Sequence, residues 1–236
     1  MSDARAEILG KIRQSRGVID DSAAEARLST RQRGIIPART DKAPGVLVDL
    51  FVTQAKFVDA SVDRVASADD VPDAVAAYLA SQNLPSEVRL APDTQLDDIP
   101  WDQRPTLLVS RGKTDGSHEV SVTAAFAGIA ETGSLMLHSG PESPSTLNFL
   151  PDHHVVVLRA SQVRKSYEDG WDDLRRQMTS RPNTLPRTVN FITGPSRTGD
   201  IEQKILMGAH GPRRLHIVLI DDGPIGTSTP EKFDGI

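Results

Sequence analysis

The chain has 236 residues, a length that allows one large domain or one domain with an appendage. Its 27 basic and 32 acidic residues give a net charge of −5, which argues against general nucleic-acid binding, because that function needs a basic surface. The chain has no cysteine, which excludes disulfides, thiolate nucleophiles and cysteine-ligated zinc or iron–sulfur clusters within it.

The first residues carry acidic side chains and no long apolar segment, which is not the pattern of a signal peptide. No apolar run approaches the roughly 18 residues that suggest a membrane span. We therefore expect a cytoplasmic protein without a membrane span.

Three regions are expected along the chain. Residues 1–45 comprise a helix at 2–15 and an extended arm, because 17–45 is polar, rich in arginine and without hydrophobic periodicity. This stretch can be a solvated linker, an arm or a partner-binding segment, and it could close over a neighbouring subunit in an oligomer. Residues 46–222 form the main domain. Residues 223–236 are expected to be a flexible tail.

Helical and strand patterns alternate through the main domain. The late apolar runs His154–Arg159 and Leu215–Asp221 suit strands buried on both faces. A helix opening at Ser161 would turn its apolar stripe toward the core. The sequence therefore predicts an α/β fold with a mostly parallel sheet and helices on both faces. His153 and His154 would point to opposite faces, and the histidine spacing predicts no metal site.

The first segment that could carry chemistry is 128–134, GIAETGS, at the entry to a strand. Gly133 would allow a positive φ or a close approach to a ligand. Glu131 is a candidate catalytic base or nucleophile, and Thr132 and Gly133 are candidate substrate-binding residues. The alternative is a connecting turn whose glutamate caps local amides.

The second segment, 194–202, follows an apolar strand, and ligands in open α/β sheets bind beyond the carboxyl ends of strands. Ser196, Arg197 and Thr198 are candidate substrate-binding residues, because hydroxyls and a guanidinium can hold a carboxylate or phosphate. The alternative is an ion pair of Arg197 with Asp200 or Glu202.

The third segment, 208–212, is GAHGP and precedes another apolar strand. His210 is preceded by Gly208 and Ala209 and followed by Gly211, and these small neighbours give its side chain room to face a pocket. Histidine titrates near neutrality when unperturbed, so His210 is a candidate proton-transfer residue. The alternative is an exposed histidine in a tight turn.

The three segments GIAETGSL, GPSRTGDIE and GAHGPRRLHIVL, in this order, resemble the LUD domain family, and within it the lactate utilization protein C type. The resemblance covers roughly residues 45–222. It implies a fold like that of the sugar isomerase and CoA-transferase superfamily, and a role in oxidising L-lactate to pyruvate. It also implies partner proteins that carry iron–sulfur clusters. The missing cysteines agree with that division, because this chain cannot ligate such clusters through thiolates. No cofactor is expected to be bound by this chain.

Three functions follow from these observations. The first is a non-redox subunit of a lactate-oxidising system, which binds iron–sulfur subunits and a small carboxylate. The second is a stand-alone enzyme of the isomerase or CoA-transferase type, with Glu131 as base or nucleophile and His210 assisting proton transfer. The second function rests only on analogy with other proteins of the same fold. The third is a binding module that senses a small carboxylate.

Overall fold

The computed structural model describes residues 2–16, 22–30, 32–179, 185–198 and 206–222. Residues 1–35 and 36–236 form two separate units. The first contains α1 (Ser2–Arg16) and α2 (Ser22–Thr30). The expectation of an irregular 17–45 stretch is therefore wrong at α2. This helix buries none of its residues, and its alanines favour a helix without creating an apolar stripe. The expected tail, 223–236, lies outside the described residues.

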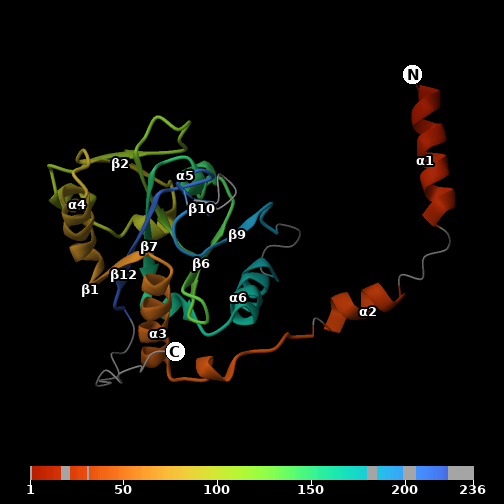
Figure 1. Ribbon diagram of the computed structural model, residues 1–236, viewed down its shortest axis with the longest axis horizontal. Coiled ribbons are helices and arrows are strands. Elements are labelled where there is room, and N and C mark those ends of the chain that lie inside the picture. The colour runs from red at the N-terminus through yellow and green to blue at the C-terminus, as the bar shows by residue number, and fades with distance from the viewer. Residues whose placement is uncertain (1, 17–21, 31, 180–184, 199–205, 223–236) are drawn as a thin grey trace. The chain divides into compact units, whose positions relative to one another are not determined.

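The second unit is built on a six-stranded sheet in the order β1-β12-β7-β4-β2-β3, and every neighbouring pair is parallel (Figure 1). The expected parallel α/β sheet is confirmed. β12 and β7 are neighbouring interior strands, and their inner residues are buried throughout, as their continuous apolar runs predict. The strands are β1 (Ser61–Val65), β2 (Glu87–Leu90), β3 (Leu108–Arg111), β4 (Val120–Ala124), β7 (His153–Arg159) and β12 (Arg214–Ile220).

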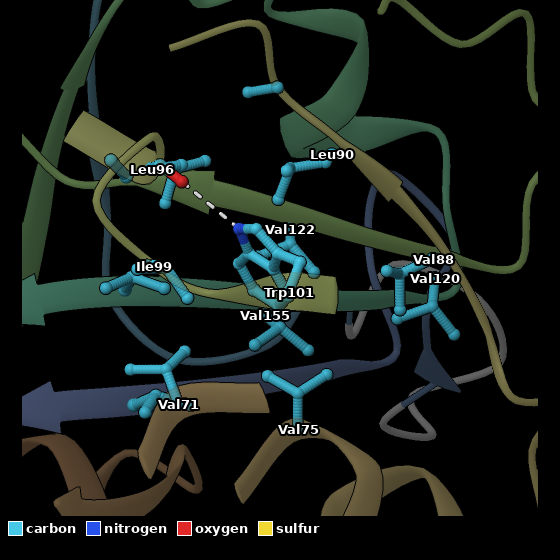
Figure 2. Packing of buried hydrophobic residues seen from close by; sticks show 14 of the residues in the cluster. Val71, Val75, Val88, Leu90, Leu96, Ile99, Trp101, Val120, Val122 and Val155 are labelled. Atoms are coloured by element: carbon cyan, nitrogen blue, oxygen red, sulfur yellow. Dashed lines mark hydrogen bonds between the residues drawn. The ribbon is translucent and has the colours of Figure 1, made fainter. Parts of the chain in front are cut away.

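One face of this sheet is covered by α4 (Val71–Ser81) and by the loop that follows β2. Valines of α4 pack on alternate residues of the central strands, and Trp101 fills the space under the loop (Figure 2). The Trp101 ring nitrogen donates to the carbonyl of Leu96 at 3.1 Å. The loop is thus attached to the core by both burial and a hydrogen bond.

The opposite face packs against α3 (Pro44–Phe57) and a second, four-stranded sheet in the order β8-β5-β6-β9. Helix α6 (Tyr167–Thr179) covers the far side of that second sheet, with Leu174 fully buried against Met136. Helices therefore lie on both sides of the main sheet, as expected. The second-sheet strands are β5 (Ala127–Ile129), β6 (Ser134–His138), β8 (Val163–Arg164) and β9 (Val189–Ile192).

Two expectations are corrected in the second sheet. The helix expected from Ser161 begins at Tyr167, because residues 160–162 form a 3₁₀ turn and β8 pairs with β5 before the helix starts. The apolar strand expected just before residue 194 is present as β9, but it runs antiparallel to β6 and does not extend the main sheet. A two-stranded ribbon follows, of β10 (Arg197–Thr198) and β11 (Leu206–Met207).

Histidines lie on both faces of the main sheet, and burial lowers their pKa values. His154 faces the α3 side, where its Nε2 lies 2.8 Å from Thr123 Oγ1, and burial lowers its pKa to about 3. His216 faces the α4 side and stacks on Tyr78 at 4.1 Å between ring centroids. Burial lowers the pKa of His216 to about 4, against the opposing effect of Asp63. His153 bonds Tyr78 on this same side, so the neighbouring histidines do face opposite ways.

Acidification is therefore expected to destabilise the second unit. Both folded pKa values lie below the ordinary 6.5, so the unfolded chain takes up protons first as the pH falls through 6.5. The stabilisation present above 6.5 is lost toward pH 4, by about 2 kcal/mol per histidine near pH 5. Urea unfolding near neutrality and near pH 5 measures this loss. His216→Phe keeps a stacked ring without a titrating nitrogen, and should remove about half of the loss. An unchanged pH dependence in that variant would contradict the assignment.

Candidate functional site

The segments around Ser196 and His210 meet at one end of the second unit. The amide of Ser196 donates to the carbonyl of Pro212 at 2.9 Å, and the amide of Gly208 donates to the carbonyl of Ser196 at 3.0 Å. The amide of His210 donates to Ser196 Oγ at 3.3 Å. Two of the three segments singled out in the sequence are thus held together by their backbones.

A cavity of about 170 Å³ lies between these two segments. Its inner wall includes His154 and Leu215, the second residues of β7 and β12, so it lies at the amino ends of the central parallel strands. Gly194–Ser196 in its wall follow the carboxyl end of β9, a strand of the second sheet. The lining residues are Asn148, Phe149, His154, Phe191, Ile192, Gly194, Pro195, Ser196, His210, Gly211, Pro212 and Leu215.

Two buried polar side chains that line this cavity have atoms without a hydrogen-bond partner. Asn148 is 1% exposed and His154 is 0% exposed. Within the described residues, neither amide atom of Asn148 has a partner, and neither does His154 Nδ1. A buried polar group without a partner costs about 1–3 kcal/mol, so such groups call for an explanation. All three atoms are completely buried, so none of them faces the open space of the cavity.

Asn148 reaches the cavity from α5 (Thr146–Phe149), a four-residue helix. This helix packs beside the first residues of β4 and β7. The hydroxyl of Ser121 in β4 donates to the carbonyl of Leu147 at 2.6 Å and fixes α5 to the sheet. Because Ser121 and Leu147 are both fully buried, the position of Asn148 is set by the core itself. No pattern in the sequence marks Asn148, which comes to the cavity only through this packing.

Arg197 and Thr198 do not line the cavity. An Arg197 guanidinium nitrogen donates to Asp59 Oδ2 at 2.6 Å and to the carbonyl of Val58 at 2.8 Å, at the end of α3. The guanidinium is thus engaged with the main domain rather than directed at the cavity. Asp200 and Glu202, the pairing partners considered from the sequence, lie outside the described residues. Thr198 pairs with Leu206 in the β10–β11 ribbon.

The turn that contains Glu131 and Thr132 lies beside the second segment but forms a separate environment. Ser134, at the start of β6, lies 2.5 Å from the Thr193 hydroxyl and 3.0 Å from the Tyr167 hydroxyl. Thr132 Oγ1 joins the same network, 2.7 Å from Ser134 Oγ. The half-buried Glu131 accepts a hydrogen bond from Arg39 at its carbonyl oxygen. Neither Glu131 nor Thr132 lines the cavity.

Gly133 has the positive φ that the sequence suggests, at 68°. The close approach that it allows is to a helix: a Cβ at this position would lie 2.2 Å from the amide nitrogen of Ala55 in α3. Gly194 has φ 73°, and a Cβ there would lie 2.1 Å from the carbonyl oxygen of Val58. Both glycines therefore place their segments against the same end of α3.

A second, larger cavity of about 730 Å³ lies near the carboxyl ends of β2, β4 and β7. Arg164 in its wall pairs with Asp173, and burial lowers the pKa of Arg164. None of the residues singled out in the sequence lines this cavity. Among the described residues, no cluster of three or more potential metal-binding side chains occurs, and no helix is long and apolar enough to cross a membrane.

Several known proteins resemble this chain. An uncharacterized protein of Neisseria meningitidis is 36% identical over 102 residues, which cover 43% of this chain and 42% of that protein. Lactate utilization protein C of Geobacillus thermodenitrificans is 30% identical over 116 residues, 48% of each chain. Both alignments thus span about half of the relative's length. Lactate utilization protein C of Deinococcus radiodurans is 27% identical over 215 residues, 84% of this chain and 97% of that protein.

The fold is shared with a solved structure, a DUF162 family protein of Deinococcus radiodurans determined at 1.70 Å resolution. Its TM-score is 0.53 at 19% identity, over 76% of this chain and 99% of that one. The LUD domain model matches residues 48–220, which include all six strands of the parallel sheet and both segments that form the smaller cavity. The chain therefore belongs to the LUD domain family.

Proposed function

We propose that this chain takes part in the oxidation of L-lactate to pyruvate, as a subunit that holds no iron–sulfur cluster itself. The observation that carries the proposal is the alignment with the lactate utilization protein C of Deinococcus radiodurans, which extends over nearly the whole of that protein. The smaller cavity supports it, because about 170 Å³ gives room for about five or six water-sized groups, the size of a three-carbon acid.

The chemistry divides between this chain and its partners. Converting the lactate hydroxyl to a carbonyl releases two electrons and two protons. The chain has no cysteine and cannot ligate an iron–sulfur cluster through thiolates, so the proposal assigns the electrons to clusters in partner proteins. This chain would bind and orient the acid. The proposal assigns proton acceptance to His210, an exposed residue that lines the cavity.

The alternative of a stand-alone isomerase or CoA-transferase-like enzyme has less support from the geometry. That activity would rest on Glu131, which lines neither the smaller cavity nor the larger one. Its neighbouring hydroxyls are occupied with Tyr167 and Thr193. A nucleophile needs access to the atom that it attacks, and the smaller cavity offers that access to Ser196 and His210 instead.

Reconstitution tests the proposal. The chain is co-expressed with candidate iron–sulfur partner proteins, and lactate-dependent reduction of a dye is measured with and without it. We expect the rate to fall by roughly tenfold or more when the chain is omitted, because orientation of the acid contributes strongly to such rates. A lactate-dependent rate that is the same in its absence would refute the proposed role.

A further inference from the structure

We infer that the 730 Å³ cavity near the carboxyl ends of β2, β4 and β7 is a binding site for a small organic amine, with Asp93 as the carboxylate that pairs with its ammonium group. This cavity shares no lining residue with the 170 Å³ cavity, so the inference goes beyond the proposed function and does not rest on it. Open α/β sheets hold their ligands at the carboxyl ends of strands, and sites for small molecules have volumes of about 300–1,000 Å³.

Asp93 brings to the cavity a carboxylate that is buried without a cationic partner. It follows β2 and is 7% exposed. Its Oδ1 accepts a hydrogen bond from the Gln95 amide at 3.0 Å. Within the described residues its Oδ2 accepts no hydrogen bond, yet this atom is not sealed from the cavity as the amide of Asn148 is. A buried carboxylate calls for a positive partner, and an ammonium group in the cavity would supply it.

Ser143 is a second buried polar side chain in the same wall, and it is 6% exposed. A tight turn fixes its backbone: the Gly140 amide donates to the Ser143 carbonyl at 3.1 Å, and the Ser143 amide donates to the Gly140 carbonyl at 3.2 Å. Its hydroxyl makes no hydrogen bond to the part of the chain that the structure describes, and the oxygen is not completely buried. The hydroxyl therefore remains open to a polar group of a ligand.

Hydrogen bonds hold the loop of Asp93 against the strand ends in the absence of any ligand. The side-chain amide of Gln162, which follows β7, donates to Gln95 Oε1 at 2.7 Å and to the carbonyl of Ala125 at 3.1 Å. Gln162 Oε1 accepts from the amide of Arg159 at 2.9 Å. Because this wall is already ordered, a ligand would bind with little further cost of ordering.

The charged side chains of the wall favour a cation over an anion. They are three carboxylates, Asp93, Glu142 and Asp173, and one cation, Arg164. Arg164 already pairs with Asp173 and donates to the carbonyl of Ser161 at 2.7 Å. Asp93 and Glu142 have no ion-pair partner among the described residues. The remaining negative charge would repel a phosphate or a carboxylate and attract an amine.

Two aromatic rings in the wall suit the carbon chain of such a ligand. Phe126 and His138 both line the cavity, and their ring centroids lie 5.5 Å apart. An alkyl chain can pack on these rings, and an ammonium group is attracted to the face of an aromatic ring. The wall thus combines a carboxylate for the charge with apolar surface for the chain.

Binding of four-carbon probes to the full-length chain tests the site. Isothermal titration is performed with putrescine, butylamine, 1,4-butanediol and succinate, which share a chain length and differ in charge. We expect both amines to bind, and the diol and succinate to bind more weakly by roughly tenfold or more, because only an ammonium group gives a charge-assisted hydrogen bond to Asp93. Binding of the diol or succinate as tight as that of the amines, or no binding of either amine at millimolar concentration, would overturn the inference.

Substitutions in the loop after β2 locate the site. Asp93→Asn keeps an acceptor for the Gln95 amide and removes the charge, so the folded variant should lose roughly tenfold or more of its affinity for both amines. The matched control is Asp102→Asn, which makes the same change in net charge at an exposed position of this loop outside the cavity. It should bind the amines as the wild type does. Unchanged binding by folded Asp93→Asn, or an equal loss in Asp102→Asn, would overturn the assignment.

A third variant decides the question if Asp93→Asn does not fold. Thr94 is exposed and lines the cavity beside Asp93, so Thr94→Lys leaves the core unchanged and brings an ammonium group of the chain itself to the wall. It should lower the affinity for both amines by roughly tenfold or more, through competition for the carboxylate and repulsion between like charges. Amine binding by Thr94→Lys that equals that of the wild type would overturn the assignment.

Discussion

Replacing Gly133 with alanine is expected to destabilise the second unit by about 3 kcal/mol or more, since two costs add. The first is the positive φ of 68°, which a side chain tolerates poorly. The second is a Cβ only 2.2 Å from the Ala55 amide nitrogen, a backbone atom that cannot move aside without shifting α3. Urea unfolding at neutral pH measures the difference.

Alanine substitutions at two other glycines distinguish the cost of the positive φ from the cost of the close contact. Gly116 has φ 101° and open space around its Cα, so Gly116→Ala should show only the conformational cost, about 1–2 kcal/mol. Gly140 has neither a positive φ nor a close neighbour, so Gly140→Ala should be within about 0.5 kcal/mol of wild type. If Gly133→Ala were no worse than Gly116→Ala, the contact with α3 would not constrain the turn.

Truncating Phe51 to alanine is expected to cost about 3–5 kcal/mol, because the side chain is completely buried between α3 and the sheet. Its ring fills the space above Gly128, where an added Cβ would lie 3.0 Å away. Phe57 on the same helix is 82% exposed, so Phe57→Ala should change the free energy of unfolding by less than about 0.5 kcal/mol. Similar effects of the two truncations in urea unfolding would contradict the described packing of α3.

The fold could be predicted from the sequence where a strand is buried on both faces along its whole length. The runs in β7 and β12 are apolar at successive positions, which predicts central parallel strands, and the structure has them there. The pairing partner of β9 could not be predicted, because the residue pattern of a strand does not show whether that strand joins the main sheet or pairs with β6. The strand β8 could not be predicted for a different reason: it has only two residues, too few to show an alternation of apolar and polar side chains.

The site was accessible only in part. The glycines and hydroxyl side chains marked the segments 194–202 and 208–212, and the fold brings Ser196 and His210 from them to one cavity. Asn148 gave no signal, because a single asparagine in a Pro/Ser-rich stretch is typical of a loop. His154 was considered only as a metal ligand and set aside. Their common position follows from the packing of α5 on the strand ends, which is a tertiary property.

The most direct test of the central claim, that this cavity serves lactate oxidation, compares three forms of the chain in the reconstituted system. Lactate-dependent dye reduction is measured with the wild-type chain, with His210→Ala and with His118→Ala, a histidine that does not line the cavity. The account predicts that the wild type and His118→Ala support the full rate, whereas His210→Ala reduces it by roughly tenfold or more. A full rate with a folded His210→Ala chain would contradict the account.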